Sequence, residues 1–200
     1  MANGNINVDS SLANISWELQ KILRIKSLQT LKITLGLDAI KIGEINNKDD
    51  FLYGQMMGYI LIHGRAIKAS LKIHYAQNLA QSITAEKLGL PLNAIDQETT
   101  DDFMREYCNL TAGYFADTLA HNNINVDISI PLITDGFDEV WFSDKVKPLA
   151  QKDYWSLAWE QGAIICTIIF QIKDLDSFGN IKMQDDDSNS PKTNEGITFL

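Results

Sequence analysis

The sequence predicts an α+β fold, a layered domain in which helices pack on one or both faces of an antiparallel β-sheet. Apolar residues recur at helical spacing in three stretches, 12–34, 75–87 and about 98–121. Apolar and polar residues alternate with period two in 67–74 and again in 126–130. The two-residue link Gly64-Arg65 joins two apolar segments, and a link this short indicates a hairpin of two antiparallel strands.

The first half of the chain is expected to contain a helix, a short strand, a hairpin and a second helix. Residues 1–10 are rich in Asn, Ser and Asp and are predicted to form a flexible arm that ends in a helix cap. The elements expected after it are a helix at 12–34, a strand at 39–45, a turn at 46–50, strands at 55–63 and 67–74, and a helix at 75–87.

The second half is expected to hold the longest helix, which Asp96 to Thr100 would cap, and then the strand 126–130 and a turn at 134–136. Residues 137–161 resist assignment and are treated as an aromatic-rich insert. Ile164 to Ile172 is apolar on both sides, which indicates a central strand. The folded domain is therefore predicted to span 11–173, followed by an acidic, disordered tail at 174–200.

Composition excludes several classes of function. A net charge of −9 and a pI near 4.7 disfavour nucleic acid and anionic membranes as partners. The longest apolar run, 164–170, is too short to cross a bilayer, and no export signal is visible, so a cytoplasmic protein is expected. Cys108 and Cys166 form no metal-binding or disulfide pattern, and three scattered histidines predict no metal site.

The most informative motif lies on the helix predicted at 98–121. Asp102, Glu106, Asn109 and Gly113 are four, three and four residues apart, so they line one face of a helix, and we call this set the polar ridge. An apolar seam is predicted beside it. The seam consists of Phe103, Tyr107, Leu110 and Tyr114.

The polar ridge has a possible chemical use. Glu106 and Asn109 lie one turn apart and can reach into one pocket of a partner, where the carboxylate can pair with a lysine and the carboxamide can orient a water molecule. Orienting water is a known route to phosphoryl hydrolysis. Gly113 would let another backbone approach closely. The spacing by itself also fits an ordinary helix face that is only solvated. Asp102 lies near the positive end of the helix dipole, where an acidic residue can have a purely structural role.

The string Asp102-x3-Glu106-x2-Asn109, with 21 residues between Asn109 and Pro131, resembles the signature of the CheC/CheX/FliY family of chemotaxis phosphatases. The flanking segments resemble the strands and helices of that family over about residues 12–173. Only one copy of the motif is present, which resembles CheX more than the two-site CheC. The resemblance therefore implies a CheC/CheX-like fold.

The resemblance also implies a function and a partner. The chain would dephosphorylate the aspartyl phosphate of a CheY-type receiver domain, with Glu106 binding the receiver and Asn109 orienting the attacking water. Asp102 and Gly113 would contact the partner, and Pro131 would be a structural part of the motif. Magnesium would belong to the receiver, the chain would need no cofactor of its own, and a homodimer is expected.

Two other functions stay open at this point. The fold could serve as a non-catalytic binding or scaffolding module for a receiver or a flagellar-switch protein. The aromatic residues at 141–159 could instead line a small-molecule pocket, although aromatic residues more often belong to a core or a subunit contact.

Overall fold

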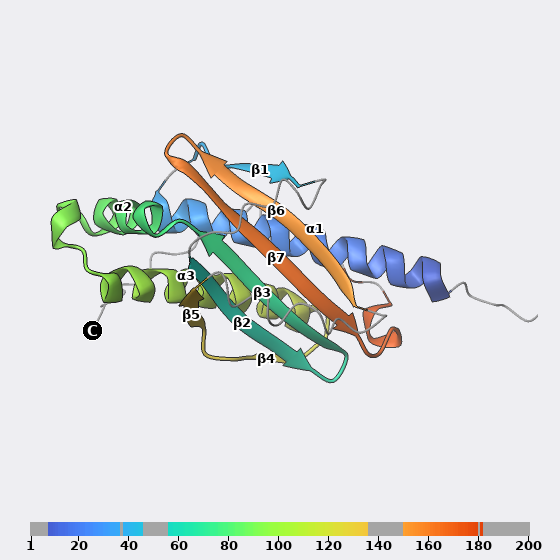
Figure 1. Cartoon of the computed structure of the whole chain (residues 1–200). Coiled ribbons are helices and arrows are strands. Elements are labelled where there is room, and N and C mark those ends of the chain that lie inside the picture. Colours follow the sequence, from blue (N-terminus) through green and yellow to red (C-terminus); the bar gives the residue numbers. More distant parts are fainter. Residues whose placement is uncertain (1–7, 37, 46–55, 136–149, 180, 182–200) are drawn as a thin grey trace, which may run out of the picture.

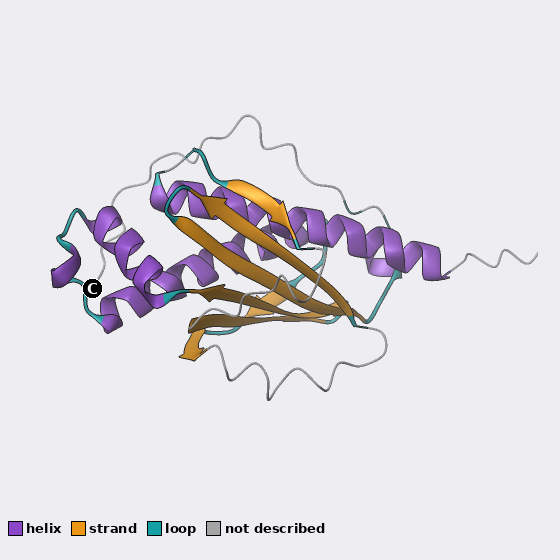
Figure 2. Ribbon diagram, turned by 45° about the horizontal axis from the view of Figure 1, so that its top comes forward, coloured by secondary structure: helices purple, strands orange, loops and turns teal. Residues whose placement is uncertain are grey.

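The computed structural model describes residues 8–36, 38–45, 56–135, 150–179 and 181. In this part of the chain, three helices lie against one face of a seven-stranded antiparallel sheet (Figures 1 and 2). The predicted α+β class with a layered antiparallel sheet is therefore confirmed, and the helices occupy a single face.

The helices are α1 (Val8–Leu35), α2 (Gln77–Leu88) and α3 (Gln97–His121). The strands are β1 (Lys41–Glu44), β2 (Met56–Gly64), β3 (Ile67–Tyr75), β4 (Val126–Ile128), β5 (Leu132–Asp135), β6 (Gln151–Trp159) and β7 (Gly162–Ile172). The strand order is β1-β6-β7-β3-β2-β4, and β5 also pairs with β2. Thus β1 forms one edge of the sheet and the β4–β5 segment forms the other, with β7 in the centre as predicted.

Two local predictions were wrong near the ends of elements. Helix α1 begins at Val8, inside the predicted flexible arm. Residues 134 and 135, predicted to be part of a turn, belong to β5, where Thr134 pairs with Met57. The reason is tertiary: β2 offers unpaired backbone groups along its edge, and pairing with them outweighs local turn preference. The predicted turn at 46–50 and Gly136 lie outside the described residues.

The predicted aromatic-rich insert is mostly a core strand in its described part. Residues 151–159 form β6, which pairs with β7 on one side and with β1 on the other. Trp155 is fully buried, and its indole Nε1 donates a hydrogen bond to Ser27 Oγ on α1 at 3.0 Å. Trp155 therefore belongs to the core and not to an open ligand pocket. Trp141 and Phe142 lie outside the described residues.

The folded part also extends beyond the predicted boundary at residue 173. After β7 the chain forms a short 3-10 helix, Asp176–Phe178, and Phe178 is only 2% exposed. Ile181 is buried in the same hydrophobic core. Two apolar side chains in a polar segment are enough to hold it against the domain, because each removes apolar surface from water. Residues 182–200 lie outside the described part.

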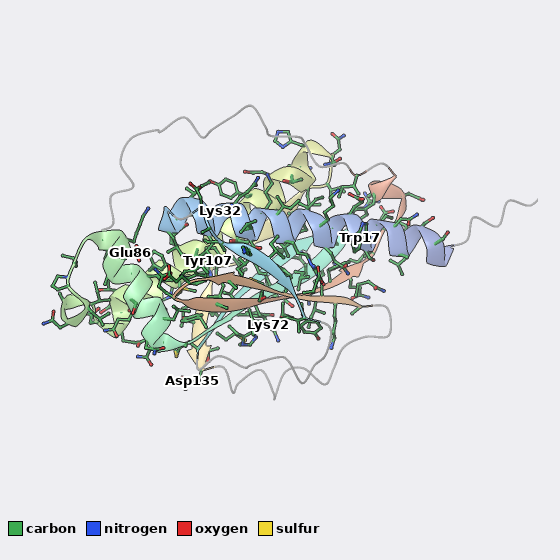
Figure 3. All side chains as sticks on the ribbon, turned by 90° about the horizontal axis from the view of Figure 1, so that it is seen from above. Trp17, Lys32, Lys72, Glu86, Tyr107 and Asp135 are labelled. Atoms are coloured by element: carbon green, nitrogen blue, oxygen red, sulfur yellow. The ribbon has the colours of Figure 1, made fainter. Side chains whose placement is uncertain are left out.

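The two faces of the sheet differ in character. On β2, the even-numbered residues Gly58, Ile60 and Ile62 face the helices and are buried in the core. Lys72 and His74 of β3 occupy the opposite face, where both are nevertheless buried. Figure 3 shows Lys72 and Tyr107 of α3 on opposite sides of the sheet. Among the described residues, no helix has the length and apolar content that a membrane span requires.

A partly buried ion pair fixes α1 to the sheet. Arg24 of α1 makes a two-pronged contact with Asp153 of β6, with both hydrogen bonds at 2.7 Å, and it also pairs with Glu44 of β1. Its guanidinium lies over the ring of Trp155, 5.9 Å from the centroid. These contacts raise the pKa of Arg24 above its ordinary value, chiefly through the bond to Asp153. The helix is thereby held at one position along β6.

Replacing Arg24 by methionine should destabilise the domain by about 3 kcal/mol, because the substitution leaves the buried carboxylate of Asp153 without its charge partner. Chemical unfolding in urea measures this change. Lys21→Met, at an exposed position of the same helix, should change the unfolding free energy by less than about 0.5 kcal/mol. Equal effects of the two variants would show that the ion pair does not anchor α1.

Candidate functional site

Helix α3 begins where the sequence places its cap. Asp96 Oδ1 accepts hydrogen bonds from the backbone N–H of Thr99 at 2.8 Å and from its hydroxyl at 2.6 Å. Both bonds hold the pKa of Asp96 below its usual range, and the bond from the Thr99 hydroxyl has the larger effect. The cap satisfies a backbone donor that the first turn would otherwise leave free. It thereby fixes the register of the signature residues that follow.

The buried side of α3 is anchored both to α1 and to the sheet. Tyr107 is fully buried, and its hydroxyl donates to the backbone carbonyl of Ser27 on α1 at 3.1 Å. Burial raises the pKa of Tyr107 well above its ordinary value. Towards the sheet, a Cβ built on Gly58 would lie only 2.6 Å from Sγ of Cys108. Glycine at position 58 therefore lets α3 approach β2 closely.

The predicted apolar seam is buried only in its first half. Phe103 and Tyr107 belong to the core, whereas Leu110 is half-buried and Tyr114 is 37% exposed. The helix buries Cys108, Thr111 and other residues closer to the sheet instead. The buried stripe of α3 is thus rotated towards the sheet relative to the prediction, because α3 packs on both α1 and β2.

The polar ridge lies on the flank of α3 that faces away from α1. Successive helical residues are about 100° apart, so Asn109 points about 200° away from Tyr107, which contacts α1. Helix α1 covers the β1–β6 side of the sheet, and α3 covers β2 and contacts β4 and β5. By the same geometry Glu106 points about 160° away from Cys108, which packs towards β2, so the ridge lies on a flank of α3 that neither α1 nor the sheet covers. Figure 1 shows α3 itself on the side of the sheet that carries β2, β4 and β5.

The side chains of the ridge are open to solvent to different degrees. Asp102 is 61% exposed and forms an ion pair with Arg105. Glu106 and Asn109 are half-exposed, and within the described residues neither makes a hydrogen bond or an ion pair. A Cβ built on Gly113 would have no atom within 4 Å. The structure thus places a carboxylate and a carboxamide side by side at the surface, with open space one turn further on.

Pro131 lies apart from the helix, between β4 and β5. Just before it, the strand pairing with β2 is completed by Ser129, whose N–H donates to Leu61 O at 2.9 Å and whose hydroxyl accepts from Leu61 N at 3.0 Å. Proline has no N–H to offer to the ladder, so its position at this break in the edge strand costs no sheet hydrogen bond. Pro131 therefore shapes the edge beside the ridge.

Sequence reasoning identified the ridge but missed the residues that surround it. Gly58 sets the distance of α3 from the sheet, and Ile128 and Ile133 lie on the edge strand beside the ridge. The alternation at 126–130 gave a signal for Ile128 but not for its proximity to α3, and no sequence pattern marked Ile133. In the described ranges, no three His, Cys, Asp or Glu side chains are grouped so that they could hold a metal ion.

The fold is similar to those of solved CheC-like and CheX proteins. A CheC-like superfamily protein from Shewanella sp. PV-4 has a TM-score of 0.63 at 24% identity, over 77% of this chain and 97% of the other. The chemotaxis protein CheX from Vibrio vulnificus has a TM-score of 0.63 at 21% identity, over 77% and 99%. CheX in the CheX–CheY–BeF3–Mg²⁺ complex from Borrelia burgdorferi has a TM-score of 0.60 at 18% identity, over 76% and 96%.

These similarities define the class as a CheC/CheX-like domain. Residues 56–148 also match the family of the chemotaxis phosphatase CheX. The resemblance predicted from the signature helix is therefore confirmed: residues 56–148 resemble CheX in sequence, and the fold is that of CheC/CheX-like proteins. No curated protein sequence matches the chain.

Gly113→Ala should stabilise the domain by about 0.5–1 kcal/mol, because alanine has the higher helix propensity and its methyl group meets no other atom of the chain. Thermal or urea unfolding measures the change. Gly58→Ala serves as the matched opposite, since its Cβ would collide with Cys108 and destabilise the core. A destabilising effect of Gly113→Ala would mean that the space above this turn is not open.

Proposed function

We propose that this chain is a phosphatase that hydrolyses the aspartyl phosphate of a CheY-type receiver domain. One observation carries the proposal: the half-exposed side chains of Glu106 and Asn109 lie one turn apart on the outer flank of α3 and have no partner among the described residues. Polar side chains held ready at the surface of a rigid helix can act on a partner without prior rearrangement.

The proposed reaction is an in-line hydrolysis. Asn109 orients a water molecule, whose oxygen forms a bond to phosphorus while the bond from phosphorus to the aspartyl oxygen breaks. The aspartate leaves as a carboxylate, and the phosphate departs as inorganic phosphate that keeps the oxygen and protons of the water, one of which it can release to solvent. Glu106 would pair with a lysine of the receiver and so fix the position of Asn109. Magnesium, which stabilises the developing charge, would be held by the receiver.

The match to the chemotaxis phosphatase CheX supports this reaction class. The Borrelia burgdorferi structure, whose fold is similar, is a complex with CheY and magnesium. We propose the same class of partner here, in the cytoplasm, with the chain acting as a homodimer as the resemblance implies. Asp102 would assist through the surface charge beside the site.

Asn109→Ala should lower the rate of receiver dephosphorylation about 100-fold or more, because the attacking water loses its orienting group. The measurement is phosphate release from a purified phosphorylated receiver. Asn93→Ala, at an exposed position outside α3, should keep the wild-type rate. If Asn109→Ala hydrolyses as fast as wild type, Asn109 does not carry the reaction; if wild type and variant both bind the receiver and neither speeds hydrolysis beyond the receiver's own rate, the scaffolding function replaces the catalytic one.

Gly113→Ala should raise KM for the phosphorylated receiver several-fold even though it stabilises the fold, because the added methyl group occupies the space reserved for the approaching backbone. Steady-state dephosphorylation at varied receiver concentration separates KM from kcat. An unchanged KM would show that the partner does not approach α3 at this turn.

A further inference from the structure

The edge strand next to the polar ridge carries exposed apolar side chains. Ile130 is 84% exposed, Ile128 is 36% exposed and Ile133 is half-buried. We call these three residues the apolar margin. Single exposed apolar residues are common on protein surfaces, but several together beside a functional surface indicate contact with a partner.

The register of the sheet shows on which face the apolar margin lies. Ile128 pairs with Ile62, and Ile133 pairs with Gly58. Residues that are directly opposite one another in an antiparallel pair point to the same face. Ile62 is fully buried under the helices and Gly58 faces Cys108, so Ile128 and Ile133 emerge on the helix face of the edge, beside α3.

Leu132 belongs to the same edge but faces the other way. It pairs with Tyr59, the neighbour of Gly58, so its side chain points to the face of the sheet that carries no helix. Leu132 is 61% exposed, more than Ile128. The two residues are therefore similar in chemistry and close along the β4–β5 segment, yet they lie on opposite faces of the sheet.

The apolar margin is continuous with the polar ridge. The Cδ1 atom of Ile133 and Sγ of Cys108 both lie next to the Cβ position of Gly58, and Cys108 directly precedes Asn109. Helix α3 also contacts both β4, the strand of Ile128, and β5, the strand of Ile133. Residues of the apolar margin thus lie on strands that contact α3, the helix that carries the polar ridge.

The opposite end of the ridge is acidic. Glu98, Asp102 and Glu106 are spaced by four residues and lie on one flank of α3, where Arg105 pairs with Asp102. Read from its N-terminal end, this flank presents carboxylates, then Asn109, then the open space at Gly113. A partner that reaches Asn109 has to cover both ends.

We propose that the apolar margin and the carboxylates of Glu98 and Asp102 form the two halves of the surface that binds the receiver domain, which sets its orientation along α3. The receiver then places a basic side over residues 98–102 and an apolar side over Ile128 and Ile130. This inference rests on the proposed function and names the residues that select the partner. The receiver is the occupant because the surface is continuous with Glu106 and Asn109 and complementary charge favours a basic partner.

The test compares Ile128→Ser with Leu132→Ser. The probes are CheY-type receivers encoded in the same genome, each activated with beryllofluoride and Mg²⁺ and titrated against the full chain. Ile128→Ser should weaken binding about tenfold, the effect of losing one well-packed apolar anchor, and raise KM without lowering kcat. Leu132→Ser should bind as wild type does. Unfolding measurements on both variants exclude loss of fold as the cause.

The contribution of the carboxylates is tested separately, through the salt dependence of receiver binding. Glu98→Gln should weaken binding and reduce its dependence on salt, because an exposed carboxylate acts over about one Debye length. Glu86→Gln, on α2, supplies the control for net charge. An unchanged salt dependence in Glu98→Gln would overturn this half of the proposal.

The outcomes separate this inference from the proposed function. If Ile128→Ser and Leu132→Ser weaken receiver binding equally, or if neither weakens it, the docking surface is overturned while the role of Asn109 stays intact. A shift of Ile128→Ser from dimer to monomer in sedimentation, with receiver binding unchanged, would assign the apolar margin to a second copy of the chain and also overturn it. Loss of hydrolysis in Asn109→Ala with retained binding would support both proposals. A wild-type chain that binds none of the receivers would overturn both.

Discussion

The close approach of α3 to the sheet is the constraint on which the site depends. Gly58 leaves room for the thiol of Cys108, and burial keeps this thiol uncharged, raising the pKa of Cys108 to about 12. Because Cys108 fixes α3 to β2 and Tyr107 fixes it to α1, the helix cannot rotate freely about its axis. The outer flank, with Glu106 and Asn109, is therefore held in one direction.

The rest of the helix layer supports this arrangement. Arg24 ties α1 to β6, and the indole of Trp155 and the hydroxyl of Tyr107 both bind Ser27 of the same helix. The position of α3 is thus linked through α1 to the far edge of the sheet. A rigid frame suits a site whose proposed task is to position water on another protein, since that chemistry depends on placement more than on reactivity.

The surface around the site combines two kinds of attraction. Carboxylates at the start of α3 act at a distance and guide the encounter, whereas the apolar side chains of the edge strand act only in contact. Pro131 lies between β4 and β5, where it interrupts the edge of the sheet and leaves one fewer backbone N–H there. The signature therefore contains Glu106 and Asn109 on the helix and also Pro131, which lies on the edge of the sheet that would contact the partner.

The sequence alone determined the three helices, the strand pair at 55–74, the cap at Asp96 and the shared face of Glu106, Asn109 and Gly113, because helix period and capping are local properties. It did not determine that 151–159 is a core strand, that residues 134 and 135 pair with Met57 and Met56, or that Phe178 returns to the core. Nor could it place Ile128 and Ile133 beside the ridge and Leu132 on the other face. Those outcomes follow from which strand lies next to which, and only the folded chain decides that, because backbone pairing and burial join residues far apart in sequence.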